Sequence, residues 1–364
     1  MSDPLLSVQN LSTVFNVPGS PVVAVDDVSF EIRKGETLGL VGESGSGKSV
    51  TAFSIVQLLQ SPGRIAAGRV LFQGKNLLEA TDAEVRHVRG AGIGLVFQEP
   101  MAALNPVMRV GDHIVEALTT HGLASRRDAR TRAIELLRAV RITDPDKRVD
   151  DYPHQLSGGM RQRVMIAVAL ACRPPLVIAD EPTTALDVTV QAQILELLRD
   201  MKKQFDLSLL LITHDLGVIA ETADRVAVMY TGRIVEEAPV RDIFRNPLHP
   251  YTQGLLASIP GGDPGSRLRA IEGSVPSLSA LPPGCTFATR CPYRMDVCTT
   301  AVPALVEIEP EHRVRCYLHA DAKEPRVGPA VLAQPVGLQF RLVFIAQHAG
   351  AACAACLALL SFRM

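Results

Sequence analysis

Apolar and polar positions form two different patterns along this chain. Residues 5–32 alternate between them around the turn Pro18-Gly19-Ser20-Pro21, which predicts short antiparallel strands. Unbroken apolar runs bounded by turn residues predict the buried strands that are typical of parallel sheets. We expect such strands at residues 37–41, 176–179, 209–212 and 226–229, and another strand and turn at 68–74.

Helices are predicted between these strands, and within residues 111–141 the apolar positions stand at helical spacing. Residues 50–56 form one such helix, which is apolar-rich, and residues 188–203 form another. Residues 111–141 differ, because their apolar positions stand among many arginines, and we interpret them as a helical insertion. Strands and helices that alternate in this way predict an α/β fold.

Proline and glycine become dense beyond about residue 256, which predicts a boundary and a loop-rich extension. We expect this extension to pack separately from the main domain. The division that we expect is a main domain over residues 1–255, with its helical part at about 99–165, an extension over 256–320 and a tail over 321–364.

The tail changes character from about residue 332. Its apolar stretch 342–362 could just reach across a bilayer, but Gln347, His348 and several alanines make it a weak span. We favour a helix that lies on a surface, or a disordered tail.

Composition argues against several classes of protein. The 364 residues, of which 47% are hydrophobic, can bury a large core. Lys and Arg (37) nearly balance Asp and Glu (38), and tryptophan is absent, so a surface that binds nucleic acid is not predicted. The first residues lack a basic start followed by a long apolar run, so we expect a cytosolic chain with reduced cysteines unless they hold metal.

Three glycines, a lysine and a serine stand where the strand at 37–41 should pass into a helix. Glycine lets backbone N–H groups gather round an anion without an intervening side chain. The spacing Gly42-x4-Gly47-Lys48-Ser49 matches the P-loop, in which the lysine reaches the β- and γ-phosphates and the serine binds Mg²⁺. The nucleotide-binding residues predicted here are Gly42, Glu43, Ser44, Gly45, Ser46, Gly47, Lys48, Ser49 and Val50.

Two further segments carry phosphate chemistry. The strand at 176–179 ends in Asp180, which can hold Mg²⁺, and Glu181, which can orient a water for attack on the γ-phosphate. Ser157 is a good helix N-cap, and Gly158 and Gly159 leave the first helical turn bare, which makes a second anion-binding helix start. The chain then contains two helix N-termini that can bind phosphate.

The segment Leu156-Ser157-Gly158-Gly159 resembles the signature of ATP-binding-cassette (ABC) ATPases, and the likeness covers roughly residues 5–255 with the motifs in order. The resemblance implies a P-loop NTPase fold with an N-terminal antiparallel β subdomain and a helical signature subdomain. It also implies hydrolysis of ATP with Mg²⁺. In that family two cassettes pack head to tail, so that the signature of one cassette caps ATP on the P-loop of the other.

The same resemblance assigns roles to single residues. Phe15 would stack on adenine, and Asp187 would bridge the two sites. Gln98 would contact Mg²⁺ and the attacking water, while His214 would contact the γ-phosphate. The catalytic set is then Glu181, His214 and Gln98, and the Mg²⁺ ligands are Ser49, Gln98 and Asp180. Without the resemblance, Phe15 could be a core aromatic residue and His214 a structural histidine.

Two short stretches, residues 99–106 and 246–252, resemble the ATP-binding subunits of bacterial oligopeptide and dipeptide importers. Nickel and glutathione importers share these features. The resemblance implies a peripheral subunit on the cytoplasmic face of the inner membrane, with a second ABC ATPase subunit, two transmembrane permease subunits and an extracytoplasmic solute-binding protein as partners. A soluble ABC ATPase that acts on DNA or ribosomes is the alternative from another class, but neither a heptad-rich insertion nor a second P-loop is present.

Four cysteines, Cys285, Cys291, Cys298 and Cys316, fall in the extension. In a short, loop-rich segment of a cytosolic chain they indicate a bound metal rather than disulfides, although the spacing is not that of a zinc ribbon. Some of the resembling permease subunits carry a [4Fe–4S] cluster in a similar region. A [4Fe–4S] cluster, a zinc ion and unliganded thiols all stay open, whereas we interpret Cys172 as a small buried apolar residue.

Overall fold

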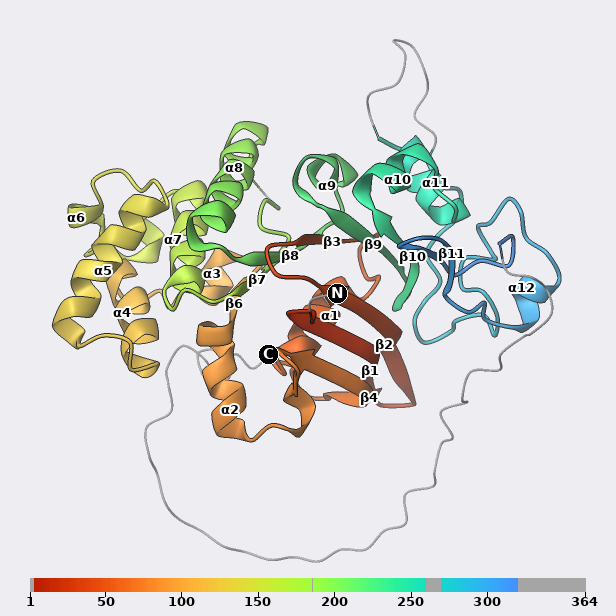
Figure 1. Ribbon diagram of the computed structural model, residues 1–364, viewed down its shortest axis with the longest axis horizontal. Helices are drawn as coiled ribbons and strands as arrows, with labels where there is room; N and C mark the ends of the chain where they lie inside the picture. The colour runs from red at the N-terminus through yellow and green to blue at the C-terminus, as the bar shows by residue number, and fades with distance from the viewer. Residues whose placement is uncertain (1–2, 185, 260–269, 320–364) are drawn as a thin grey trace, which may run out of the picture.

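Two β-sheets lie at the centre of the molecule, with helices packed around them (Figure 1). The computed structural model describes residues 3–184, 186–259 and 270–319. The smaller sheet is antiparallel and confirms the strands expected near the N-terminus. Its strands, in spatial order, are β2 (Ser20–Ile32), β1 (Leu6–Val17), β4 (Gly63–Phe72) and β5 (Lys75–Asn76).

The larger sheet contains all four of the buried strands expected along the chain. Its spatial order is β11 (Val306–Glu309), β12 (His312–Val314), β10 (Arg233–Pro239), β9 (Arg225–Tyr230), β3 (Thr37–Val41), β8 (Ser208–Thr213), β7 (Leu176–Asp180) and β6 (Ile93–Val96). The strands from β9 to β6 pair in parallel, so their carboxyl ends meet at one edge. Loops that leave this edge are the usual place for a ligand in an open α/β sheet.

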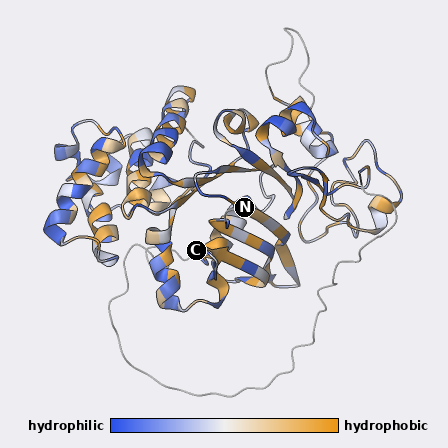
Figure 2. Ribbon diagram, viewed as in Figure 1, coloured by the Kyte–Doolittle hydropathy of each residue, from blue (hydrophilic) through white to orange (hydrophobic). Residues whose placement is uncertain are grey.

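Side chains alternate across the parallel strands and divide the core into two layers. Leu176 and Ile178 of β7 pack toward the smaller sheet, whereas Val177 and Ala179 pack toward the helices. Such strands are buried on both faces, which explains their unbroken apolar sequence. Figure 2 shows the hydrophobic colour along these central strands and a mixed pattern on the outer helices.

Helices confirm the insertion expected between β6 and β7, which lies at the opposite end of the molecule from the extension (Figure 1). The helices of the insertion are α3 (Pro100–Ala103), α4 (Val110–Thr120), α5 (Arg126–Ala139), α6 (Pro145–Arg148) and α7 (Gly158–Leu170). The other helices of the described residues are α1 (Lys48–Ile55), α2 (Asp82–His87), α8 (Val188–Phe205), α9 (Leu216–Thr222), α10 (Val240–Arg245), α11 (Pro250–Ala257) and α12 (Val297–Thr300). Short 3-10 turns span Leu77–Glu79 and Pro153–Gln155, and a π-type turn spans Val88–Gly92.

The extension does not pack separately, contrary to our expectation. Its strand β12 pairs with β10 and so continues the large sheet. Glu236 of β10 is fully buried and accepts hydrogen bonds from the backbone of Leu248 (2.7 Å) and of His249 (2.9 Å), while His312 Nε2 lies 2.8 Å from it. A buried carboxylate needs such partners, and here β12 supplies one of them.

Residues 321–364, including the apolar stretch 342–362, lie outside the described residues. Across the described ranges, no helix has both the length and the apolar character needed to span a bilayer.

Candidate nucleotide-binding site

The P-loop connects β3 to α1 at the carboxyl edge of the parallel strands. Gly47 precedes the helix with a φ of 100°, in the left-handed region that favours glycine. A Cβ at Gly47 would lie 2.5 Å from the carbonyl oxygen of Ala24, so the backbones approach too closely for any side chain. The loop therefore turns tightly and exposes backbone N–H groups at the start of α1.

Lys48 is held over this loop by backbone oxygens. Its Nζ donates to the carbonyl oxygens of Gly42 (2.8 Å) and Glu43 (3.0 Å) and lies 4.0 Å from Glu181 Oε1. Burial lowers the pKa of the Lys48 ammonium, and the nearby carboxylates of Glu181 and Asp180 oppose that shift. The ammonium is thus placed among the loop atoms that a polyphosphate would approach.

Ser49 and Asp180 meet behind the P-loop. Ser49 Oγ donates to Asp180 Oδ1 at 3.0 Å, which joins the first turn of α1 to the end of β7. Burial raises the pKa of the Asp180 carboxyl, and the hydrogen bond from Ser49 works against that shift. A hydroxyl and a carboxylate oxygen side by side are ligands of the type that Mg²⁺ takes.

Glu181 lies at the centre of the predicted catalytic group. Its Oε2 accepts from Gln98 Nε2 (3.1 Å) and from Thr184 Oγ1 (2.8 Å), and His214 Nδ1 lies 3.5 Å from the same oxygen. Loops after β6, β7 and β8 bring these side chains together. Since the Glu181 side chain is 14% exposed, a water could reach a carboxylate that neighbouring groups hold in place.

Lys48, Ser49, Gln98, Glu181 and His214 line one cavity of about 840 Å³, whereas Asp180 is not among its lining residues. Its lining residues are Ala24, Gly42, Glu43, Ser44, Gly45, Gly47, Lys48, Ser49, Val50, Gln98, Glu181, His214, Leu255, Ser258, Ala270, Ile271 and Leu278. Ala24 and the last five were not predicted. Ala24 comes from β2, and the others come from the end of α11 and the extension. No local pattern marks them, because their place in the site comes from tertiary packing alone.

The signature residues lie in a different cavity of about 450 Å³. Ser157 caps α7, because its Oγ accepts from the backbone N–H of Met160 at 3.3 Å, and Gly158 and Gly159 form the first helical positions. Asp187 caps α8 by accepting from Val190 at 2.9 Å and lines the same cavity. The two cavities share no lining residue, so the two predicted phosphate-binding ends do not meet within the described part of this chain.

Phe15 lies on β1 and is half-buried, and it does not line the P-loop cavity. A Cβ at Gly63 would lie 2.8 Å from its ring atom Cε1, so the ring rests against the backbone of the neighbouring strand β4. The structure therefore does not bring Phe15 together with the other predicted residues.

All four cysteines of the extension are free and line one small cavity of about 10 Å³, which is room for about one water molecule. Burial raises the pKa of the Cys285 thiol to about 11 and that of Cys316 to about 12. Four cysteine thiols are, by their chemistry, suitable ligands for a metal that binds thiolates. Yet no three Cys, His, Asp or Glu side chains of the described residues converge as ligands of one ion, so the structure does not support the metal expectation.

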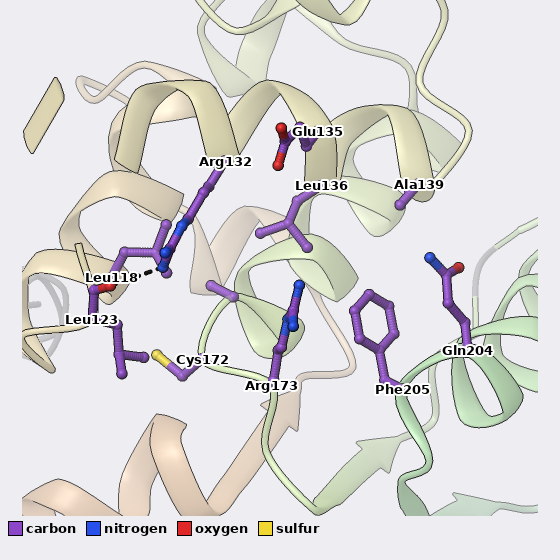
Figure 3. A pocket seen from close by; sticks show the side chains of 11 residues that line it. Leu118, Leu123, Arg132, Glu135, Leu136, Ala139, Cys172, Arg173, Gln204 and Phe205 are labelled. Atoms are coloured by element: carbon purple, nitrogen blue, oxygen red, sulfur yellow. Dashed lines mark hydrogen bonds between the residues drawn. The ribbon is translucent and has the colours of Figure 1, made fainter. Parts of the chain in front are cut away.

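A separate hollow of about 390 Å³ lies between α4, α5 and the chain before β7 and β8 (Figure 3). Arg132 donates to the carbonyl oxygen of Leu123 at 2.8 Å beside it, and Arg173 lies 6.0 Å from the ring centre of Phe205. Cys172 lines it from the turn after α7, rather than from within that helix, and is only half-buried. The hollow is near the amino ends of the strands, so it is not part of the P-loop cavity.

A P-loop on β3, a carboxylate pair at the end of β7 and a signature at the start of α7 define an ABC ATPase. Residues 25–184 match the ABC transporter family, and residues 235–298 match the family described as the C-terminal region of oligopeptide/dipeptide transporters. The chain belongs to the ATP-binding subunits of oligopeptide and dipeptide ABC transporters. It is accordingly an ATPase that uses ATP and Mg²⁺.

Several relatives support this membership. The oligopeptide transport ATP-binding protein AppD of Bacillus subtilis is 53% identical over 319 residues, which cover 87% of this chain and 97% of AppD. The dipeptide transport ATP-binding protein DppD of Haemophilus influenzae is 50% identical over 86% of this chain and 95% of its own length. A solved dimeric ATP-binding cassette in a post-hydrolysis state with ADP and phosphate is 29% identical with a TM-score of 0.59, covering 65% of this chain and 99% of its own.

Proposed function

We propose that this chain hydrolyses ATP to drive the import of dipeptides and oligopeptides across the bacterial cytoplasmic membrane, from a peripheral position on its inner face. The observation that carries this proposal is that an ABC ATPase site and an oligopeptide/dipeptide-type C-terminal region occur in one chain. Relatives named for peptide transport, of which the chain covers nearly the full length, support the same substrate class.

The proposed partners are a second ABC ATPase subunit, two transmembrane permease subunits and an extracytoplasmic solute-binding protein. The separation of the P-loop cavity from the signature cavity supports the second cassette, because one chain does not close a P-loop with its own signature. In the proposed pair, Ser157, Gly158 and Gly159 bind ATP held by the partner cassette, and Asp187 links the two sites.

Within one site, we assign water activation to Glu181, with Gln98 and His214 beside it. The contacts of these two residues with Glu181 Oε2 support that assignment. Ser49, Asp180 and Gln98 are the proposed Mg²⁺ ligands, and residues 42–50 hold the phosphates. Phe15 is proposed to stack on adenine from outside the residues that line the P-loop cavity.

Uptake of a labelled dipeptide tests the substrate class. Cells that lack this chain should lose uptake of the dipeptide and regain it when the wild-type chain is supplied. The matched Glu181→Gln variant should be produced at the wild-type level but should not restore uptake. If the cells without this chain keep peptide uptake but lose uptake of nickel or of glutathione, the chain would be assigned to a nickel or glutathione importer instead. Normal uptake of all three, with recovery of the chain on ribosomes or DNA, would favour the soluble class.

The four cysteines of the extension are proposed to hold a [4Fe–4S] cluster, with zinc as the alternative. The proposal rests on the presence of four cysteines in one short segment, whose thiols all line one small cavity, although no three of them converge as ligands of one ion in the described residues. Their raised pKa values mean that protons must leave when metal binds, so loading should release protons. The bound group would add cross-links to a segment that has little core of its own.

A further inference from the structure

The second residue of the P-loop is an acid, although the loop serves to bind a polyanion. Glu43 lines the nucleotide cavity, and its side chain is 29% exposed. A carboxylate there would repel the phosphates of ATP unless a cation compensates it. The compensating cation comes from the extension, 247 positions further along the chain.

Arg290 binds Glu43 through both arms of its guanidinium. One terminal nitrogen donates to Glu43 Oε2 at 2.7 Å, and the other donates to Oε1 at 3.1 Å. Two parallel charge-assisted hydrogen bonds fix the direction of the carboxylate as well as neutralise it. The Arg290 side chain is only 4% exposed, so water screens this pair weakly.

Arg290 is itself held in place by other groups of the protein. It donates to the carbonyl oxygens of Ile271 (3.3 Å) and Glu272 (3.1 Å), and it lies 5.9 Å from the ring centre of Tyr230. The guanidinium of an arginine stays charged throughout the pH range in which proteins are folded. The contacts of Arg290 within the protein therefore fix the orientation of the guanidinium, so ATP binding does not have to supply that ordering.

The backbone of Glu43 is fixed from the main domain as well. Its N–H donates to Tyr251 Oη of α11 at 2.9 Å, and its carbonyl oxygen accepts from Lys48 Nζ at 3.0 Å. Tyr251 and Tyr230 pack with ring centres 4.6 Å apart, and Arg290 lies over the ring of Tyr230. The conformation of the loop at Glu43 thus depends on α11 and on the extension together.

We propose that Arg290 is a positioning residue of the nucleotide site, which neutralises Glu43 and holds the P-loop in the shape that ATP requires. The proposal deepens the ATPase site and is independent of the transported solute. Its consequence is that the extension takes part in ATP binding without touching the reacting atoms.

The test is calorimetric titration of MgATP into the purified full-length chain. Arg290→Met keeps an unbranched side chain over the aromatic rings but removes the charge, and it should weaken MgATP binding by about tenfold, because Glu43 is left as a bare negative charge beside the phosphates. Arg290→Lys keeps a cation and should lose about threefold or less. ATPase assays should show the loss in KM more than in kcat.

The decisive comparison adds Glu43→Gln. This substitution removes the repelling charge, so the double variant Arg290→Met/Glu43→Gln should recover MgATP affinity to within about twofold of Glu43→Gln alone. A role in folding alone would give no such recovery. Unchanged affinity in Arg290→Met, or no recovery in the double variant, would overturn the proposal.

Arg315 provides a matched control. It is also a buried arginine that directly precedes a cysteine of the extension cavity, and it binds the carbonyl oxygen of Ile234 (3.0 Å) and Asp27 (3.2 Å), away from the P-loop. Arg315→Met should destabilise the extension and leave MgATP affinity within about twofold of wild type. An equal loss in both variants would mean that loosening of the extension, not Arg290, weakens the site. If Arg290→Met does not fold, the Arg290→Lys and Glu43→Gln titrations still decide the proposal, because a loss of about tenfold or more in Arg290→Lys, or weaker MgATP binding in Glu43→Gln, would overturn it.

Discussion

Ser49 Oγ donates to Asp180 Oδ1 at 3.0 Å, so the residue after the P-loop lysine is joined directly to the end of β7. If the two oxygens hold Mg²⁺, Asp180→Asn should leave binding of metal-free ATP nearly unchanged, because the phosphate contacts of the loop survive. ATP hydrolysis should then need about tenfold more Mg²⁺ or more. A Mg²⁺ titration of the ATPase rate checks this, and an unchanged midpoint would remove Asp180 from the ligand set.

Glu181→Gln should retain MgATP binding while the rate of hydrolysis falls by about 10² or more, because an amide cannot take a proton from the attacking water. The matched variant Thr184→Val removes a neighbour that donates to Glu181 at 2.8 Å and should slow the reaction less. Single-turnover hydrolysis with pre-bound ATP separates chemistry from binding. A Gln variant that turns over at the wild-type rate would show that another group activates the water.

His113 makes stability depend on pH near the start of α4. Its Nε2 accepts from the backbone N–H of Asn105 at 2.9 Å, and its Nδ1 lies 2.8 Å from the carbonyl oxygen of Arg109. Burial lowers the pKa of His113 below its usual 6.5, with partial opposition from the Arg109 contact. Below about pH 6.5 the unfolded chain binds a proton that the folded chain does not, so stability should fall on acidification by at most about 1.4 kcal/mol per pH unit.

His113→Gln provides the control for this pH dependence, because it can accept the Asn105 hydrogen bond without titrating. Unfolding by urea at several pH values between 7.5 and 5 should show a shallower decline for the Gln variant than for wild type. Equal slopes would assign the decline to other groups.

Anaerobically purified chain should be brown and contain iron and acid-labile sulfide if the extension cysteines hold a cluster. Replacing any one of Cys285, Cys291, Cys298 or Cys316 by serine should remove both, whereas Cys172→Ser, outside the cavity, should not. Stoichiometric zinc without iron would identify a zinc site. Four freely titratable thiols in the native anaerobic protein would exclude both metals.

Much of the central architecture could be predicted because its signals are local. The strand Thr37–Val41 has the predicted bounds, since an apolar run followed by a glycine-rich loop leaves little choice of start and end. The family resemblance placed Gln98 and His214 in the site, and the topology explains why they lie beside Glu181, because residues after parallel strands meet at one edge.

Other parts depend on contacts that no local pattern records. Glu43 and Arg290 are 247 positions apart, and no sequence motif contains both residues or predicts their contact. Strands β11 and β12 have four and three residues, too few for an alternating pattern to stand out. The separate packing expected of the extension was wrong for this reason, since two short strands and a few buried ion pairs join it to the main domain.

The pairing of β12 with β10 also has a consequence for solubility. Without the extension, β10 would be the last strand of a sheet, and its free N–H and C=O groups could pair with another molecule. Glu237, fully buried between Arg225 and Arg313, would keep only one of these partners. In the full chain the short strand β11, with four residues, ends the sheet instead of β10, with seven. A chain cut after Ala257 should therefore aggregate more readily than the full chain, because it presents the longer strand as its edge.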